Sequence, residues 1–293
     1  MPSHRAFTLA ETAIVAAVGV IGAAIAQVGL APTDARYPTA SLLKLKHLGT
    51  ATAQYQADNN NYTPITLTYT RGTAPRSPYL TATGWCTWSA GGKNNHSYWY
   101  SSGGGGFDVE AADRPLNAYA ESGVVYSAPP FPTRMGPTDP ARTTAQAESF
   151  RDPFDTWTNQ RSWPVSTTSI SSYDDVGTSY QWSYAWWDQI SRVFPSLGYE
   201  DRMHEGTRRI AQGDGAAPSR FVWLTDPSMT ITINHPSSSA QISNWYGAKN
   251  RSVMLFLDGR AAYLPTYPGR RLQSYVNPDY SLVFENLPNP GSG

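Results

Sequence analysis

The stretch RAFTLAETAIVAAVGVIGAAIAQ, residues 5–27, opens the segment that decides how this chain is organised. Across residues 12–31 the only clearly polar side chain inside the run is that of Gln27. About twenty residues in an α-helix rise roughly 30 Å, the thickness of the hydrocarbon core of a bilayer. We therefore predict a membrane-spanning helix over residues 7–31, with Arg5 ahead of it holding that end in the cytoplasm.

Two kinds of processing fit this segment. As a secretory signal, it offers the small-x-small pattern Ala24-Ile25-Ala26, and cleavage after Ala26 makes Gln27 the mature amino terminus. The product is then a secreted or membrane-tethered, aromatic-rich binding protein, with polysaccharide as a candidate ligand.

The alternative kind of processing starts from Glu11, because a charged group at the centre of a span costs about 2.5–3.5 kcal/mol on insertion scales. Unless Glu11 only reaches back to the interface, it needs a partner that a secretory signal does not supply.

The front edge of the segment, Ala6-Phe7-Thr8-Leu9-Ala10-Glu11, resembles the type IV prepilin signature. In that signature a short charged leader and a small residue precede Phe-Thr-Leu-x-Glu and an apolar helix. The resemblance implies that a prepilin peptidase removes residues 1–6 and that the new amino terminus, on Phe7, is methylated. It also implies that the Glu11 carboxylate pairs with the Phe7 amine of a neighbouring subunit. The family usually has glycine before the cut, where this chain has Ala6.

The same resemblance implies the setting and the partners of the protein. A pilin-like subunit or pseudopilin belongs to the bacterial cell envelope. It is first a single-pass inner-membrane protein with a cytoplasmic amino terminus, and then part of a periplasmic or cell-surface filament. Its partners are other pilin-like subunits, contacted through the N-terminal helix, the prepilin peptidase and the inner-membrane assembly platform. The filament is a type IV pilus or a type II secretion pseudopilus.

The residues after the apolar run predict the rest of the domain organisation. Pro32 and Pro38 interrupt the helix, so residues 32–40 form a linker. Residues 41–60 form an amphipathic helix packed on a globular head, which comprises residues 61–293. The helix is indicated by a stripe of residues that recur at spacings of three and four, Leu42, Leu45, Leu48, Thr52 and Tyr55.

The head is expected to be rich in β-structure. Residues 219–226 and 230–234 carry the β-branched and aromatic side chains of strands. A β-hairpin is predicted over residues 253–264, where Asp258-Gly259 joins two apolar runs in a favoured turn. A short helix is predicted near residues 184–193. The fold class predicted is α+β: a long N-terminal hydrophobic helix, half transmembrane and half amphipathic, packed on a mostly antiparallel β-sheet head with long loops.

Several segments of the head resemble a second pattern, that of the large planctomycete-type pilin-like proteins with a carboxy-terminal H-x9-DG domain. They are LKLKHLGTATAQYQADNNNYTP, DRPLNAY, FRDPFD, GTSYQWSY, RFVWLTD and NRSVMLFLDGRAAYL. The motif's histidine position, however, holds Ala248, and the residue after Asp258-Gly259 is Arg260 rather than histidine. Asp152 stands in place of a family cysteine. If the family's histidine binds a metal or serves a processing contact, this chain lacks that group.

The composition excludes several classes of function. Lysine plus arginine number 22, as do aspartate plus glutamate, and this neutrality argues against a nucleic-acid partner. Cys86 is the only cysteine, so an intrachain disulfide is impossible and the thiol is expected to be a small buried residue. Metalloprotease, nucleophile-elbow, P-loop and dinucleotide motifs do not occur. We therefore predict that the protein is not an enzyme.

Two remaining features are candidate binding sites. Asp174-Asp175 is a low-priority calcium loop, of a kind that related secretion pseudopilins use; without D-x-D-x-D-G spacing an ordinary turn is favoured, and no cofactor is predicted. A group of tryptophans forms either a sugar-binding or protein-binding surface or the core, and the core is favoured. These are Trp85, Trp88, Trp99, Trp157, Trp163, Trp182, Trp186 and Trp187. The function expected from the sequence is that of a structural, pilin-like subunit.

Overall fold

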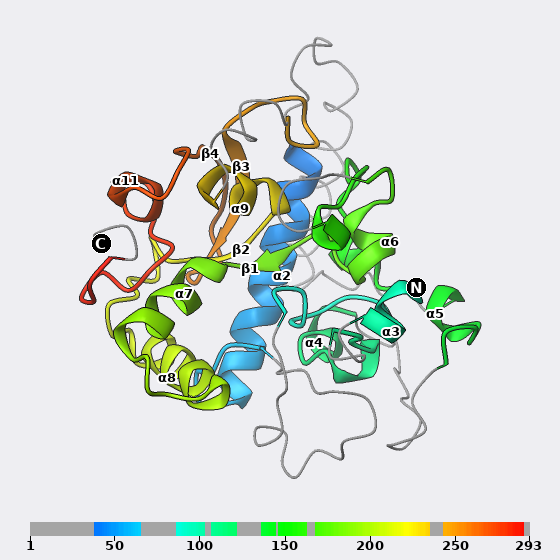
Figure 1. Ribbon diagram of the computed structural model, residues 1–293, viewed down its shortest axis with the longest axis horizontal. Helices are drawn as coiled ribbons and strands as arrows, with labels where there is room; N and C mark the ends of the chain where they lie inside the picture. Colours follow the sequence, from blue (N-terminus) through cyan, green and yellow to red (C-terminus); the bar gives the residue numbers. More distant parts are fainter. Residues whose placement is uncertain are drawn as a thin grey trace, which may run out of the picture.

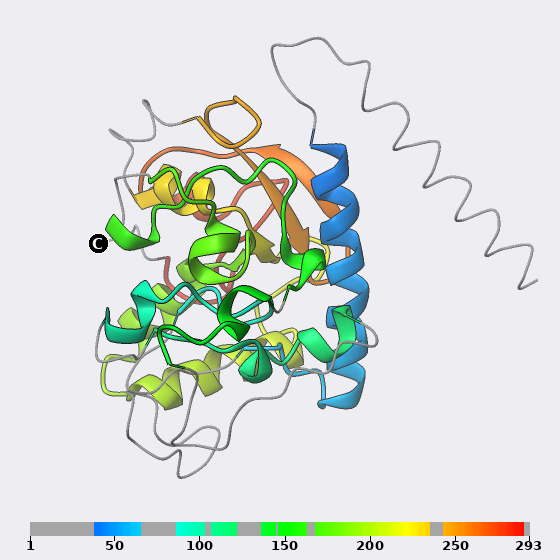
Figure 2. The ribbon, with the colours of Figure 1, turned by 90° about the vertical axis from the view of Figure 1, so that its right-hand side faces the viewer.

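The structure is a computed structural model in which short helices and loops surround a small sheet, with one longer helix along one side (Figure 1, Figure 2). The predicted leader, the membrane-spanning segment and the residues Ala6, Phe7 and Glu11 lie outside the part of the chain that it describes. The structure describes residues 38–65, 86–102, 107–121, 136–144, 146–162, 168–234 and 243–289.

Helix α2 (Thr39–Asp58) corresponds to the amphipathic helix expected after the prolines. Its buried side chains recur at the spacing of a single helix face. The chain leaves the helix through Asn60 and Asn61, whose φ angles of 54° and 63° fall in the left-handed region that asparagine tolerates. The buried residues of α2 are Ser41, Leu45, Leu48, Gly49, Ala51 and Thr52.

Four strands form an antiparallel sheet in chain order, β1-β2-β3-β4. Successive side chains of β3 point to opposite faces. Val253 and Leu255 join the same apolar cluster as Leu45 of α2, whereas Met254 and Phe256 join a second cluster with α9. Figure 2 accordingly shows the sheet between α2 and α9. The strands are β1 (Gln181–Trp182), β2 (Val222–Thr225), β3 (Arg251–Phe256) and β4 (Ala261–Pro265).

Helices outnumber strands in the described part of the chain. Most are short, and α7 and α8 pack against each other beside the sheet (Figure 1). The α-helices besides α2 are α3 (Tyr98–Ser101), α4 (Asn117–Ala120), α5 (Ala141–Thr144), α6 (Ser172–Val176), α7 (Tyr184–Val193), α8 (Tyr199–Gln212), α9 (Pro227–Asn234) and α11 (Leu272–Tyr275). The 3-10 helices are η3 (Ala111–Asp113), η4 (Glu148–Phe150) and η5 (Gln160–Ser162).

The predicted hairpin is present as β3 and β4, and its turn has a defined geometry. The N–H of Gly259 donates to the carbonyl oxygen of Phe256 at 3.0 Å, and the N–H of Phe256 donates to the carbonyl oxygen of Arg260 at 2.9 Å. Gly259 has a φ of 82°, which a residue with a side chain rarely adopts. This is a three-residue loop that ends in a glycine bulge.

Most of the tryptophans that the structure describes are buried in the core, as predicted. Trp182 and Trp186 are almost completely buried, and their rings pack 5.1 Å apart. Trp157 is half-buried, and Trp85 and Trp163 lie outside the described residues. Cys86 is also buried, and this burial raises its pKa to about 12, as expected of an unreactive thiol. A binding surface made of these tryptophans therefore gains no support.

The predicted fold class is wrong. No long apolar helix exists in the described part of the chain, and the head is a mixture of helices around a small four-stranded sheet rather than a mostly β body. Across the described ranges, every helix is too short or too polar to span a bilayer. The strand predicted at residues 230–234 is also wrong, because these residues belong to α9.

Helix α9 replaces the predicted strand for a local reason. Asp226 stands before Pro227, and its Oδ1 accepts the N–H of Ser228 at 2.9 Å, which caps the first turn. Its Oδ2 accepts the N–H of Val253 at 2.9 Å, which fixes the cap to β3. Because α9 is buried on most sides, its sequence needs no amphipathic period, and the alternation at residues 230–234 does not indicate a strand.

Candidate functional site

The face of α2 that contacts the head is the candidate functional site, and we call it the α2 junction. It comprises Leu45, Leu48, Gly49 and Thr52, which pack against β3, β4, α4 and η4. Helix α2 is the first described element after the apolar segment, so this face is where that end of the described chain packs on the head.

Helix α2 approaches the β3–β4 turn closely at Gly49. A Cβ atom placed on Gly49 would lie 3.0 Å from the Cα atom of Gly259 and 3.2 Å from its carbonyl oxygen. The same atom would lie 3.0 Å from the Cδ1 atom of Leu255. The helix can pack this tightly on the hairpin only because position 49 has no side chain.

Polar contacts fix the position of α2 along the sheet. The indole N–H of Trp223 donates to the Thr52 hydroxyl at 3.2 Å, deep in the core. The Nε2 atom of His47 lies 2.8 Å from the carbonyl oxygen of Ala120, at the end of α4. The ammonium group of Lys44 donates to the carbonyl oxygen of Glu148 in η4. Sequence reasoning identified the helix but none of these contacts, which depend on partners 73 to 171 residues away.

The segment DRPLNAY, which ends at α4, is organised by a buried arginine. The Arg114 guanidinium donates to the carbonyl oxygens of Trp88, Gly91 and Val176 at 2.6, 2.9 and 2.8 Å. Burial lowers the pKa of Arg114 to about 10, so the group keeps its charge at neutral pH. The Asn117 side chain accepts the N–H of Gly92 at 2.7 Å and donates back to its carbonyl oxygen at 2.8 Å. Arg114 and Asn117 thus hold loops together.

The segment FRDPFD contributes a buried carboxylate, Asp152, and a half-buried one, Asp155. Asp152 is buried, and its Oδ2 accepts the hydroxyl groups of Tyr246 at 2.6 Å and Tyr180 at 3.0 Å. Burial raises the pKa of Asp152, and the bonds from Tyr246 and Tyr180 partly oppose this. Where the resembling family has a cysteine, this chain therefore has the centre of a buried hydrogen-bond network.

Asp155 ends the same segment and caps helix α6. It accepts the N–H groups of Ser172 at 2.9 Å and Tyr173 at 2.8 Å, and the Ser179 hydroxyl donates to it at 2.6 Å. Burial raises its pKa to about 7, and the charge of Asp152 adds to the effect. These contacts give Asp155 a structural role. The Asp-Pro pair at residues 226–227, directly before α9, is a local signal by which such a cap can be sought in the sequence, whereas the cap from Asp155 to α6 has none.

The candidate calcium ligands Asp174 and Asp175 are engaged by cations of the chain. The Lys93 ammonium lies 2.7 Å from Asp174, and the Arg161 guanidinium lies 2.7 Å from the fully buried Asp175. The bond from Lys93 and its charge help to lower the pKa of Asp174. Among the described residues no group of three or more histidine, cysteine, aspartate or glutamate side chains is placed to hold a metal ion. The two residues form the first turn of α6 instead.

Asp258, Gly259 and their neighbours serve the hairpin. Asp258 accepts the N–H of Arg260 at 2.9 Å within the turn. The Arg260 guanidinium lies 3.6 Å from the centroid of the Phe256 ring and donates to the carbonyl oxygen of Ser219 at 2.7 Å. Ala248, at the motif's histidine position, contributes only its backbone, whose N–H donates to Asn244 at 2.9 Å. Asp258 and Gly259 lie in the turn, whereas Ala248 lies in the loop before β3, and no metal-ligating cluster is found at either place among the described residues.

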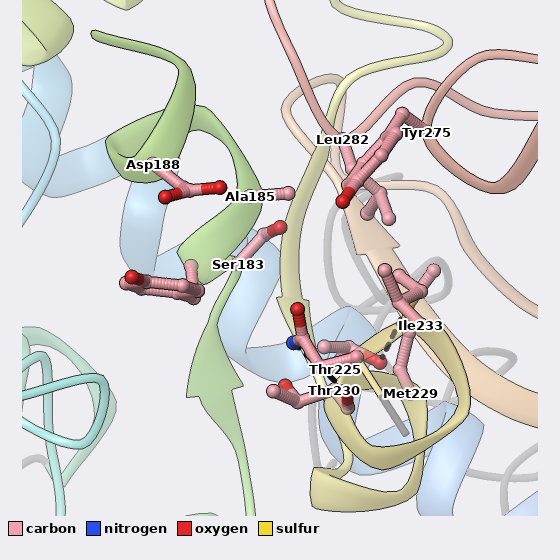
Figure 3. Close-up of a pocket in the computed structure, with 11 residues that line it drawn as sticks. Ser183, Ala185, Asp188, Thr225, Met229, Thr230, Ile233, Tyr275 and Leu282 are labelled. Carbon is pink, nitrogen blue, oxygen red and sulfur yellow. Dashed lines mark hydrogen bonds between the residues drawn. The ribbon is translucent and has the colours of Figure 1, made fainter. Parts of the chain in front are cut away.

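One small cavity lies beside β2, at the start of α7. Figure 3 shows Tyr275 and Ser183 on either side of it, with Met229 and Ile233 of α9 below. Its volume is about 10 Å³, which suits one water molecule rather than a substrate. The buried hydroxyl of Tyr275, which has no hydrogen-bond partner within the described residues, is the group that such a water would satisfy.

The chain matches no protein-family model. Comparisons with curated proteins and with solved structures also found no match.

Proposed function

We propose that this protein is a structural, pilin-like subunit of the bacterial cell envelope. A prepilin peptidase cuts between Ala6 and Phe7, and the apolar residues 7–31 first anchor the subunit and then form part of a filament core. The filament is a type IV pilus or a type II secretion pseudopilus. The observation that carries the proposal is Glu11, placed four residues after Phe7 at the head of an apolar run long enough to span a bilayer.

The carboxylate of Glu11 gains a stabilising partner only when subunits assemble into a filament. A lone carboxylate in hydrocarbon is costly, and the free amine of Phe7 on an adjacent copy would neutralise it. Pairing of this kind sets the axial register between subunits. A cleaved secretory signal never meets such a partner, so the rival proposal leaves Glu11 without a role.

The head supports a structural role through the kind of residues that it buries. Arg114, Asp152 and Asp155, which belong to the segments that resemble pilin-like proteins, are engaged by backbone and hydroxyl groups rather than directed into a cleft. Helix α2, which follows the apolar segment, is joined to the head by the close packing of the α2 junction and by hydrogen bonds that include those of Thr52, His47 and Lys44. Close packing of this kind holds α2 firmly to the head, which suits a subunit that is pulled into a filament by its N-terminal segment.

The test is assembly of Glu11→Ala in a bacterium that carries a pilus or a type II secretion machine. Sheared surface filaments and the membrane fraction are compared for the wild-type chain, Glu11→Ala and the control Thr12→Ala. We expect all three to reach the membrane, and only Glu11→Ala to be lost from the filament fraction. Equal amounts of Glu11→Ala and wild-type chain in filaments would contradict the proposal.

A further inference from the structure

A groove beside α11 is the most exposed apolar feature of the described surface. It has a volume of about 440 Å³ and is lined by residues 267, 271–273 and 276–278. Leu272 is 65% exposed, more than any other large hydrophobic residue in the described part of the chain, and Tyr267 is 37% exposed. Arg271 is the one charged residue in this lining. Next to the lining along the chain, Arg270 bonds Asn234 at 3.1 Å and the exposed Asp279 follows Pro278. The groove is thus mainly apolar, with one cation in it.

A second exposed hydrophobic residue has the opposite electrostatic setting. Tyr199 is 51% exposed and begins α8, whose first turn also carries Glu200 and Asp201. The Tyr199 ring stacks on the buried Trp187, with the ring centroids 5.8 Å apart and an interplanar angle of 15°. Because one face of the ring is held by Trp187, little conformational entropy is lost when the other face is covered.

We propose that the α11 groove of one copy receives the Tyr199 turn of a second copy of this chain. Tyr199 is an aromatic side chain that would insert between Tyr267 and Leu272. The acidic first turn of α8, with Glu200 and Asp201, would then face Arg271, the cation of the groove. Aromatic and arginine side chains are the residues that most often carry the energy of protein contacts. Tyr199 is not among the residues that line the groove of its own copy, so the proposed contact needs a second copy.

This contact rests on the proposed function in one respect. A single side chain in a groove buries far less area than a stable dimer interface needs, so it is weak between free molecules. Copies held side by side in one membrane or filament have a high effective concentration, and the same contact then becomes populated. The inference adds to the proposed function a contact between heads, separate from the N-terminal segment.

The test is site-specific crosslinking of full-length chains in the membrane. One tagged copy carries Gln273→Cys at the groove, and a second, differently tagged copy carries Ser196→Cys beside the Tyr199 turn. Both positions are exposed, and the natural thiol of Cys86 is buried. A short bis-maleimide should join the two tags. Absence of the crosslinked pair would overturn the proposal.

Matched variants separate this contact from chance collision. Leu272→Asp or Arg271→Glu in the groove copy should lower the crosslinked yield about fivefold or more. Glu200→Arg in the other copy should restore the yield lost through Arg271→Glu, whereas Tyr98→Asp, at another exposed tyrosine, should change nothing. A crosslinked yield that is the same for the groove variants and the wild-type groove would also overturn the proposed contact.

The amino terminus of the same samples distinguishes the two proposals. Methylated Phe7 without a crosslink removes the head contact and leaves the subunit function standing. A groove-dependent crosslink in a chain that begins at Gln27 removes the pilin-like function and leaves the contact between copies.

Discussion

Gly49 of α2 lies directly against Gly259 in the β3–β4 turn, with 3.0 Å between a Cβ built on the first and the Cα of the second. Two short sequence signals, a helix and a hairpin separated by about two hundred residues, thus meet at two positions without side chains. Gly259 is needed in the turn because its φ is positive. Gly49 is needed in the helix because a side chain there would collide with the turn. The α2 junction depends on both.

Replacing Gly49 by valine should therefore destabilise the head. The added side chain meets the backbone of Gly259 and the Leu255 side chain, and overpacking of this kind costs about 1–3 kcal/mol. Ala53→Val, on the exposed side of the same helix, is the matched control and should cost only a few tenths of a kcal/mol, roughly the difference in helix propensity. Chemical denaturation of both variants measures the difference, and equal stabilities would contradict the close packing.

Arg114→Lys should destabilise the head strongly, although it keeps the charge. A lysine has three donors on one atom and cannot reach the carbonyl oxygens of Trp88, Gly91 and Val176 together. Leaving buried acceptors unpaired costs about 1–3 kcal/mol for each group. Arg192→Lys, at an exposed pair with Asp188, serves as the control and should be nearly neutral. Thermal unfolding of the two variants compares them, and a wild-type melting temperature for Arg114→Lys would refute the role of Arg114.

The head should lose stability as the pH rises from 4 to 7. The pKa of Asp155 is raised from 3.8 to about 7 in the folded protein, so the folded state holds a proton that the unfolded state has released. The associated stabilisation is complete below the unfolded pKa of 3.8 and disappears as the pH rises through 7. The buried Asp226, with its pKa raised to about 6, adds to the same trend.

Asp155→Asn should make this pH dependence shallower. The amide still accepts the N–H of Tyr173 or Ser172 at the start of α6, but it cannot ionise. Melting temperatures of the wild-type chain and of Asp155→Asn, measured from pH 4 to pH 8, provide the comparison. Parallel curves for the two proteins would show that Asp155 titrates as an ordinary exposed carboxylate.

The sequence predicted local elements well where a pattern and its cap agree. The stripe through Leu45 and Leu48 predicts α2, and Asp258-Gly259 between apolar runs predicts the hairpin. At residues 230–234 the alternating pattern misled, because Asp226 and Pro227 start a helix that is buried on both sides. The cap, rather than the period, was the stronger signal there.

The tertiary arrangement could not be predicted in the same way. The bond between Thr52 and Trp223 joins residues 171 positions apart, and no local pattern indicates such a partner. Asp174 and Asp175 show the same limit: as a pair of acids they resembled a calcium loop, and only the fold reveals Lys93 and Arg161 beside them. Overestimating the β content had a related cause, since aromatic residues that favour strands here pack between helices.

The most direct test of the central claim is the mass of the N-terminal peptide of the exported protein. Prepilin processing predicts a peptide that begins at Phe7, carries an added methyl group on its amine and still contains Glu11. A chain that begins at Gln27 would have lost Glu11 with its signal, and the proposed subunit function would be contradicted.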